Sequence, residues 1–249
     1  MTAEGVYVYA IIRAGRPLPT GAGGVGSPAA PVRTVRQGRL AAVVSEAPPK
    51  LRARRRDLLA HQELLLRLSA EGPVLPMRFG MVAPDEETVR GRLAADEADH
   101  IAALERLSDG VEINVKALPA QNALADLVAE DKKVRRLRDE ARRRPGYEAS
   151  LRLGEAVAAA LQSRAAAAGR RILRELTPLA RAVAPGPDVQ GCVLNVSFLV
   201  GRGDSNDFHR VAERFADKHR THVELRLAGP LPCYSFVSAE ATHARTVGA

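Results

Sequence analysis

The sequence predicts an α+β protein with two domains, and three observations support this prediction. Short runs rich in β-branched and aromatic residues alternate with long amphipathic stretches of helical periodicity. The length of 249 residues suits one large domain or two small ones, with enough chain for a hydrophobic core. The strand and helix patterns form two clusters, so we expect one domain over residues 1–109 and a second over residues 110–249.

The first domain is expected to begin with a small sheet. Residues 6–12 are β-branched and aromatic, which is typical of a strand. Residues 14–31 are rich in Gly and Pro and indicate a loop. Residues 32–36 and 39–45 predict a β-hairpin, whose second strand is nearly continuously apolar and should therefore be central.

Two helices should complete the first domain. The first is predicted over residues 51–70 and is ended by Gly72-Pro73. We expect its apolar stripe to comprise Leu58, Leu59, Leu65, Leu66 and Leu68. The second is predicted from Pro84 to about residue 109, because acidic residues follow Pro84 where the helix dipole is positive.

A short, mostly apolar segment, residues 73–80, lies between these helices. In an extended chain one face would carry the odd-numbered side chains Leu75, Met77 and Phe79. Arg78 would lie on the opposite face. Pro76 lacks a backbone donor, so this strand should lie at a sheet edge or be irregular. An edge strand beside a helix favours a docking surface over a catalytic motif.

The second domain is predicted to be a plait with an inserted helical hairpin. Residues 111–116 alternate strictly, which is typical of a half-buried strand. The hairpin should occupy about residues 120–184, with helices over residues 122–144 and 147–183. The remaining elements are strands over residues 192–200, 223–227 and 233–237 and a helix over residues 204–219. Strands joined through helices favour crossovers that place the helices on one sheet face.

The charge leaves several partner classes open. The net charge is +8 and the isoelectric point about 10.1, which suits nucleic acid, anionic lipid or an acidic protein. Most arginines are interleaved with acidic residues on helical stretches, which indicates solvated helix faces. Two arginine-rich runs, residues 52–56 and 135–144, could contact phosphates. Aromatic residues make up only 4% of the chain, so it has few side chains on which nucleic-acid bases could stack.

No targeting or membrane segment is visible. No apolar run approaches the ~20 residues of a membrane span, and residues 1–5 lack the pattern of a signal peptide. Cys192 and Cys233 do not form a disulfide framework, and we expect both to be buried free thiols. The expected location is the cytoplasm.

No motif predicts catalysis, a cofactor or a metal. Residues 21–26 match G-x-G-x-x-G, but prolines follow where a dinucleotide site needs a helix, so we expect a flexible loop. His219 and His222 form an H-x-x-H pair, but they straddle a helix–strand junction and lack a third ligand. His61 lies within the first helix and is expected at the surface. We therefore expect no enzyme.

Six ordered blocks of the chain resemble the GvpF/GvpL family of gas vesicle proteins. The most specific block is residues 73–80, and the others are residues 7–11, 40–45, 147–155, 193–200 and 224–237. The resemblance implies two domains, one of them with a modified ferredoxin-like fold, in agreement with the strand order predicted for the second half. It implies a non-enzymatic accessory protein, a minor structural or assembly component of the gas vesicle. It does not separate F-type from L-type members.

The resemblance also implies partners: the small hydrophobic shell protein and other gas vesicle accessory proteins. The candidate partner-binding residues are Leu75, Met77, Arg78, Phe79, Tyr147 and Arg152. Our hypothesis is that the protein covers the apolar shell subunit and keeps it soluble for assembly. Under the competing hypothesis, residues 75–79 belong to the core and Arg78 forms an internal ion pair. A basic nucleic-acid-binding protein is the alternative function, and an enzyme is the third class.

Overall fold

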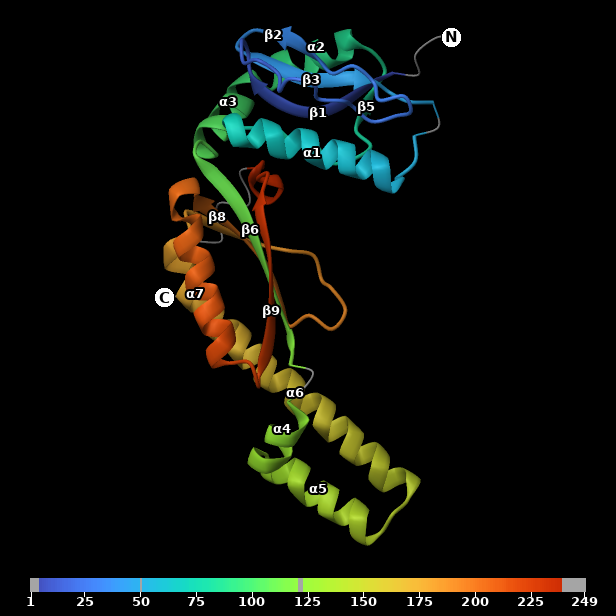
Figure 1. Cartoon of the computed structure of the whole chain (residues 1–249), viewed down its shortest axis with the longest axis vertical. Helices are drawn as coiled ribbons and strands as arrows, with labels where there is room; N and C mark the ends of the chain where they lie inside the picture. Colours follow the sequence, from blue (N-terminus) through green and yellow to red (C-terminus); the bar gives the residue numbers. More distant parts are fainter. Residues whose placement is uncertain (1–4, 50, 121–122, 239–249) are drawn as a thin grey trace. The chain divides into compact units, whose positions relative to one another are not determined.

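The chain forms two compact units that each combine helices with a sheet (Figure 1). The computed structural model describes residues 5–49, 51–120 and 123–238. One unit comprises Met1–Glu112 and Pro230–Ala249, and the other is Ile113–Gly229. The predicted mixture of helix and sheet is confirmed. The units depart from the predicted limits mainly because Pro230–Ala249 groups with the first unit.

The sheet of the first unit contains five strands. They are β1 (Val6–Arg13), β2 (Arg33–Gln37), β3 (Leu40–Glu46), β4 (Leu75–Pro76) and β5 (Val82–Ala83). The order is β2-β3-β1-β4, and β5 also pairs with β1. Strands β2 and β3 form the predicted hairpin, and β3 is central as predicted. The segment at residues 73–80 contributes only the two residues of β4, at the sheet edge, where the missing donor of Pro76 is tolerated.

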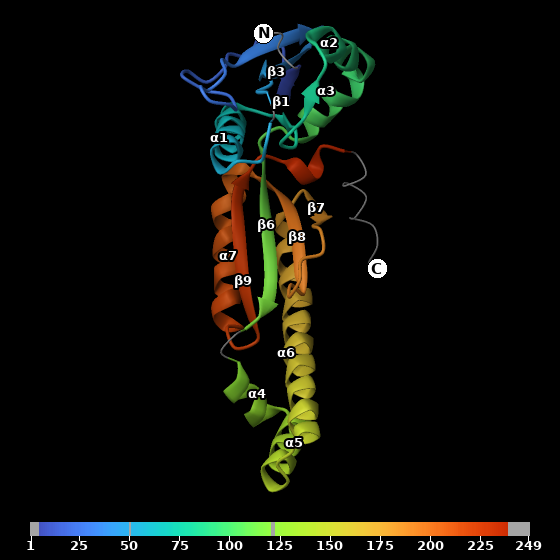
Figure 2. The same ribbon diagram turned by 90° about the vertical axis from the view of Figure 1, so that its right-hand side faces the viewer.

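Helices cover both faces of this sheet (Figures 1 and 2). Helix α1 (Arg55–Glu71) lies on one face, and α2 (Glu86–Ala95) and α3 (Glu97–Arg106) lie on the other. Helix α2 begins after Asp85, whose carboxylate accepts a hydrogen bond from the backbone N–H of Thr88. The predicted single helix from Pro84 is instead two helices, because the chain bends at Asp96.

The buried face of α1 differs from the predicted stripe. Leu58 and Leu59 are exposed, so their assignment to the stripe was wrong. The buried positions are Asp57, His61, Leu64, Leu65 and Leu68. These positions recur at helical spacing and form one face of the helix. Asp57 and His61 can be buried on this face because each side chain has a hydrogen-bond partner in the core. The helix also begins at Arg55 and not at residue 51.

The sheet of the second unit contains four strands, and two of the unit's four described α-helices lie along it (Figure 2). The strands are β6 (Gly110–Pro119), β7 (Ala182–Pro185), β8 (Leu194–Gly201) and β9 (Val223–Leu231), in the order β7-β8-β6-β9. The helices are α4 (Leu124–Glu130), α5 (Lys132–Arg143), α6 (Tyr147–Leu176) and α7 (Ser205–Lys218). Helices α6 and α7 pack against each other and against β8.

Three predictions about the second half were wrong. The helix predicted over residues 122–144 is divided at Asp131. The Asp131 carboxylate accepts hydrogen bonds from the N–H groups of Lys133 and Val134 and thereby caps the start of α5. Asn122, the first residue of the predicted helix, lies outside the described residues. Helix α6 ends at Leu176, and Ala182–Pro185 forms β7 by pairing with β8. The strand predicted at residues 233–237 is a 3₁₀ turn, Tyr234–Phe236, because Ser235 binds the buried carboxylate of Glu112.

Among the residues that the structure describes, no helix combines the length and apolarity that a membrane crossing requires. The sequence also predicts that the tail from Ser238 is frayed, but residues 239–249 lie outside the described ranges.

Candidate partner-binding surfaces

The edge segment is anchored to α1 through His61. The Tyr7 Oη atom lies 2.9 Å from His61 Nδ1, and His61 Nε2 lies 3.1 Å from the carbonyl oxygen of Met77. A carbonyl only accepts, so Nε2 carries the proton and the Tyr7 hydroxyl donates to Nδ1. The Gly80 N–H donates to Tyr7 Oη at 3.1 Å. These hydrogen bonds attach both ends of the turn after β4, Met77 and Gly80, to the core.

The predicted surface position of His61 was therefore wrong. Its side chain is only 3% exposed, because both ring nitrogens have partners and the ring packs between Tyr7, Tyr9 and Phe79. Burial lowers the pKa of His61, and the hydrogen bond to the Met77 carbonyl opposes that shift. Burial also raises the pKa of Tyr7. Both groups are therefore neutral at pH 7, as the hydrogen-bond chain requires.

We expect His61 to make the protein less stable in mild acid. In the unfolded chain the imidazole binds a proton near its ordinary pKa of 6.5, whereas in the folded chain its pKa is lower. The unfolded state therefore binds more protons below pH 6.5, so the contribution of His61 is complete above 6.5 and is lost as the pH falls towards the folded pKa. Denaturant unfolding between neutral and mildly acidic pH checks this for wild type and His61→Gln. Equal pH slopes in both proteins would contradict it.

The glycine-rich loop before β2 is also anchored to the core. The Val25 N–H donates to Tyr9 Oη at 2.7 Å, and the Gly26 N–H donates to the buried carboxylate of Asp57 at 2.9 Å. Val25 itself is fully buried. The predicted loop is present, and two of its backbone donors tie it to side chains of β1 and α1. Turns, and no helix, follow the glycines up to Pro31.

The four candidate residues of the edge segment lie in different environments. Leu75 is fully buried and is not available at the surface. Phe79 is partly buried on the α1 side, with ring centroids 6.0 Å from Tyr7 and 5.7 Å from His61. Met77 lines a pocket on the side of α2. The predicted common face was wrong for Met77 and Phe79, because the chain leaves the strand after Pro76 and turns.

Arg78 is exposed at the outside of this turn. Across the described ranges it forms no ion pair and no hydrogen bond. The competing hypothesis placed residues 75–79 in the core and gave Arg78 an internal ion pair. Its first part holds for Leu75, which is buried in the core. Its second part does not hold among the described residues, because Arg78 has no ion pair there. The guanidinium remains available for a carboxylate or a carbonyl of a partner.

A pocket of about 170 Å³ opens beside Met77 on the face of the sheet covered by α2. Its walls are mostly apolar: Val8, Ile11, Ala42, Met77, Met81, Ala83, Val89 and Leu93, with Arg92, Asp96 and His100 completing the lining. The Nδ1 atom of His100 is shielded from solvent and has no hydrogen-bond partner among the described residues. Met81 and Val82 are 40% and 38% exposed at the neighbouring edge. The volume is below the roughly 300–1,000 Å³ of small-molecule sites and suits one apolar side chain.

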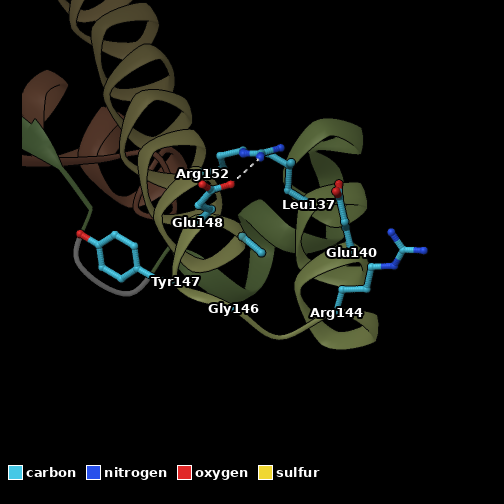
Figure 3. A pocket seen from close by; sticks show the side chains of 8 residues that line it. Leu137, Glu140, Arg144, Gly146, Tyr147, Glu148 and Arg152 are labelled. Atoms are coloured by element: carbon cyan, nitrogen blue, oxygen red, sulfur yellow. Dashed lines mark hydrogen bonds and ion pairs between the residues drawn. The ribbon is translucent and has the colours of Figure 1, made fainter.

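The other two candidates, Tyr147 and Arg152, both lie near the tip of the helical hairpin (Figure 3). They line a hollow of about 410 Å³ with Leu137, Glu140, Arg144, Gly146, Glu148 and Ala149. Arg152 Nη2 lies 3.3 Å from Glu148 Oε2, one helical turn away. The Tyr147 ring points away from the hollow and is 83% exposed (Figure 3). The hollow thus mixes cations and carboxylates beside an exposed aromatic ring.

A small apolar cluster holds the hairpin together behind this hollow. Its buried members are Leu127, Val134 and Ala156, and six partly buried residues pack on them: Val128, Leu137, Leu153, Val157, Ala160 and Leu161. The sequence pattern also predicts Leu124 on the apolar side of this helix, but Leu124 is exposed in the first turn of α4. The cluster fixes how α5 presents its opposite, charged side.

The remaining sequence candidates show no catalytic or metal-binding arrangement. The rings of His219 and His222 lie 6.1 Å apart, centroid to centroid. Within the described part of the chain, no three His, Cys, Asp or Glu side chains are placed to hold a metal ion. Cys233 is buried and forms no disulfide, as predicted, whereas Cys192 is only partly buried. Helical spacing from Leu68 back through Leu64 to His61 was the available signal for the buried histidine.

Comparisons with known proteins identify related chains. Residues 5–238 match the family model described as gas vesicle synthesis protein GvpL/GvpF. Gas vesicle protein F of Streptomyces sp. (strain CB03234) is 43% identical, over 93% of this chain and 98% of its own. Gas vesicle protein L of the same strain is 33% identical, over 92% and 91%. The nucleic-acid alternative has no support among these matches.

Two crystal structures share the fold. The gas vesicle protein GvpF from Anabaena sp. PCC7120 superposes with a TM-score of 0.74 at 24% identity, over 94% of this chain and 98% of that one. The GvpF structure from Microcystis aeruginosa gives a TM-score of 0.71 at 21% identity, over 94% and 99%. Both comparisons span the two units.

Proposed function

The chain belongs to the gas vesicle synthesis protein GvpL/GvpF family, and from this membership we propose that it is a non-enzymatic assembly factor that binds the small hydrophobic shell protein. Membership itself supports an accessory role in the gas vesicle. The observation that carries the proposed binding is the apolar pocket at Met77, beside exposed Met81 and Val82 and an Arg78 that has no partner in the described ranges.

In this proposal the edge segment receives an apolar part of the shell subunit. One aliphatic side chain enters the pocket, and Met81 and Val82 cover the residues on either side. Arg78 binds a carboxylate or a chain carbonyl of the subunit, which sets its direction. The hydrogen-bond chain through Tyr7 and His61 keeps the turn in place, so little ordering entropy is lost on binding. A covered shell subunit remains soluble until it is added to the vesicle.

We also propose a division of roles between the two units. The second unit, with its β-α-β-β-α-β element order and its strand order β7-β8-β6-β9, is a modified ferredoxin-like plait into which the hairpin is inserted. Tyr147 and Arg152 at the hairpin tip bind other gas vesicle accessory proteins. The protein acts in the cytoplasm and at the gas vesicle. The limits of the two units are proposed as domain limits.

Arg78→Ala should weaken retention of the shell protein without unfolding the chain. We expect at least about fivefold less co-purified shell protein, because a charge-assisted hydrogen bond of about 1.5–3 kcal/mol is lost at the interface. The stability should change by less than about 0.5 kcal/mol, since Arg78 is exposed. Co-expression of the shell protein with wild type, Arg78→Ala and the matched surface control Arg36→Ala measures this, by pull-down and by the soluble fraction of shell protein.

Two results would contradict the proposal. Equal retention by Arg78→Ala and Arg36→Ala would remove Arg78 from the interface. If a DNA competitor displaced the shell protein, or if the chain retained DNA in its place with strong salt dependence, the basic surface would be the functional one.

A further inference from the structure

Helix α5 presents a dense row of positive charge to solvent. The cationic stripe, as we call it, comprises Lys132, Arg135, Arg136, Arg143 and Arg144. All five are exposed, and they surround a shallow hollow of about 610 Å³ together with Asp139 and Glu140. Residues 132–144 hold eight Lys and Arg against two acidic residues, so most of the net charge of +8 is concentrated here.

The stripe is fixed in orientation, and its positive charge exceeds the charge of the two acidic residues in the same hollow. The opposite side of α5 packs against α6 through Val134 and Leu137, and Asp131 caps its first turn. Within the described ranges, no cation of the stripe forms an ion pair. Asp139 is engaged instead by Arg138, at 2.8 Å on the neighbouring side of the helix. Like charges held this close repel one another, so a complementary partner is favoured.

The stripe continues into the hollow at the hairpin tip. Glu140 and Arg144 line both the shallow hollow of the stripe and the hollow at the tip, so the two are contiguous. Tyr147 is exposed at the start of α6, but its ring points away from this hollow (Figure 3). A ligand that follows the surface from the stripe would therefore meet Arg144 and then the ion pair of Arg152 with Glu148.

We propose that the cationic stripe docks an acidic helical segment of a protein partner. This inference rests on the proposed accessory role and specifies the chemistry of the partner that the hairpin binds. Carboxylates on one face of the segment bind the arginines of the stripe. Nucleic acid fits less well, because its phosphates would also face Asp139 and Glu140, whereas a protein can place a donor opposite them.

The test uses the full chain and three fluorescent probes. One is a synthetic amphipathic helix of roughly 20 residues with glutamates on one face and leucines on the other. The second is the same composition in scrambled order, and the third is a DNA duplex. Anisotropy titrations at low and at physiological ionic strength give the affinity and salt dependence of each probe. We expect the helical peptide to bind at least about fivefold more tightly than the scrambled one, a difference of about 1 kcal/mol.

Charge reversal locates the interaction. Arg136→Glu with Arg143→Glu should weaken binding of the helical peptide at least about tenfold. The matched control, Arg214→Glu with Arg220→Glu, changes the net charge equally at exposed positions of α7 and the turn after it, and should have a much smaller effect. Arg136→Gln with Arg143→Gln provides a milder pair if the reversed chain does not fold.

Three outcomes would overturn the inference. They are equal loss in the stripe and control variants, equal affinity for the ordered and scrambled peptides, and tighter binding of the duplex than of the helical peptide. These titrations contain no shell protein and leave Arg78 unchanged, so their failure is separate from failure of the shell-protein pull-down.

Discussion

Tyr7→Phe should lower the free energy of unfolding by about 2–4 kcal/mol, although it removes only one oxygen atom. The ring contacts with Tyr9 and Phe79 are retained. The hydroxyl, however, both accepts from the Gly80 N–H and donates to His61 Nδ1. Each buried polar group left without a partner costs about 1–3 kcal/mol. Denaturant unfolding at a pH above 7 measures the difference while His61 is neutral.

Tyr147→Phe is the matched control for this substitution. Its hydroxyl belongs to an exposed side chain, so the stability should change by less than about 0.5 kcal/mol. Tyr7→Phe should also weaken shell-protein retention, because the turn that carries Arg78 loses an anchor. If both tyrosine variants unfolded at the same denaturant concentration as wild type, the hydrogen-bond chain through His61 would not stabilise the fold.

Gly24→Ala should be comparably damaging, at about 2–4 kcal/mol. A Cβ atom at this position would lie 2.4 Å from Tyr9 Oη and 2.9 Å from the carbonyl oxygen of Ala30. Tyr9 cannot retreat easily, because it is fully buried and its hydroxyl is bonded to Ser45 Oγ and the Val25 N–H. The expected cost combines overpacking of about 1–3 kcal/mol with a strained or broken hydrogen bond of about 1 kcal/mol.

A glycine in open surroundings is the control for this effect. Gly91 lies within α2, and a Cβ atom there would meet nothing within 4 Å. Gly91→Ala should therefore stabilise the protein by about 0.5–1 kcal/mol, through the lower helix propensity of glycine. The two substitutions thus have opposite expected signs in the same thermal or denaturant measurement. Destabilisation by both, to a similar extent, would contradict the steric explanation for Gly24.

Local patterns in the sequence were sufficient for most elements of the fold. The strands of the first hairpin, the alternation in β6 and the start of α2 at Asp85 follow from side-chain period and capping chemistry, which depend on neighbours in sequence. Pro76 likewise placed β4 at a sheet edge, because a missing donor is a local property. The family resemblance in residues 73–80 and five further blocks could also be recognised from the sequence alone, and the comparisons with known proteins confirmed it.

Other features depended on partners far away in the chain. His61 is buried because its two ring nitrogens bond to the Tyr7 hydroxyl and the Met77 carbonyl. Residues 182–185 form a strand because they pair with β8. Residues 234–236 form a turn because the Glu112 carboxylate accepts hydrogen bonds from the N–H and the hydroxyl of Ser235. In each case a polar group or a backbone edge was satisfied by tertiary contact, which overrides a local preference worth less than about 1 kcal/mol per residue.

The same distinction applies to the candidate surfaces. The sequence alone determined which residues to consider, the mixed fold class and the gas vesicle family. Only the tertiary structure decided that Leu75 is core, that Met77 and Phe79 point to opposite sides, and that Arg78 is exposed at the turn. It also decided that Tyr147 and Arg152 share a hollow with α5. The reason is geometric, since a side chain's access to a partner is set by what packs over it, and those residues are remote in sequence.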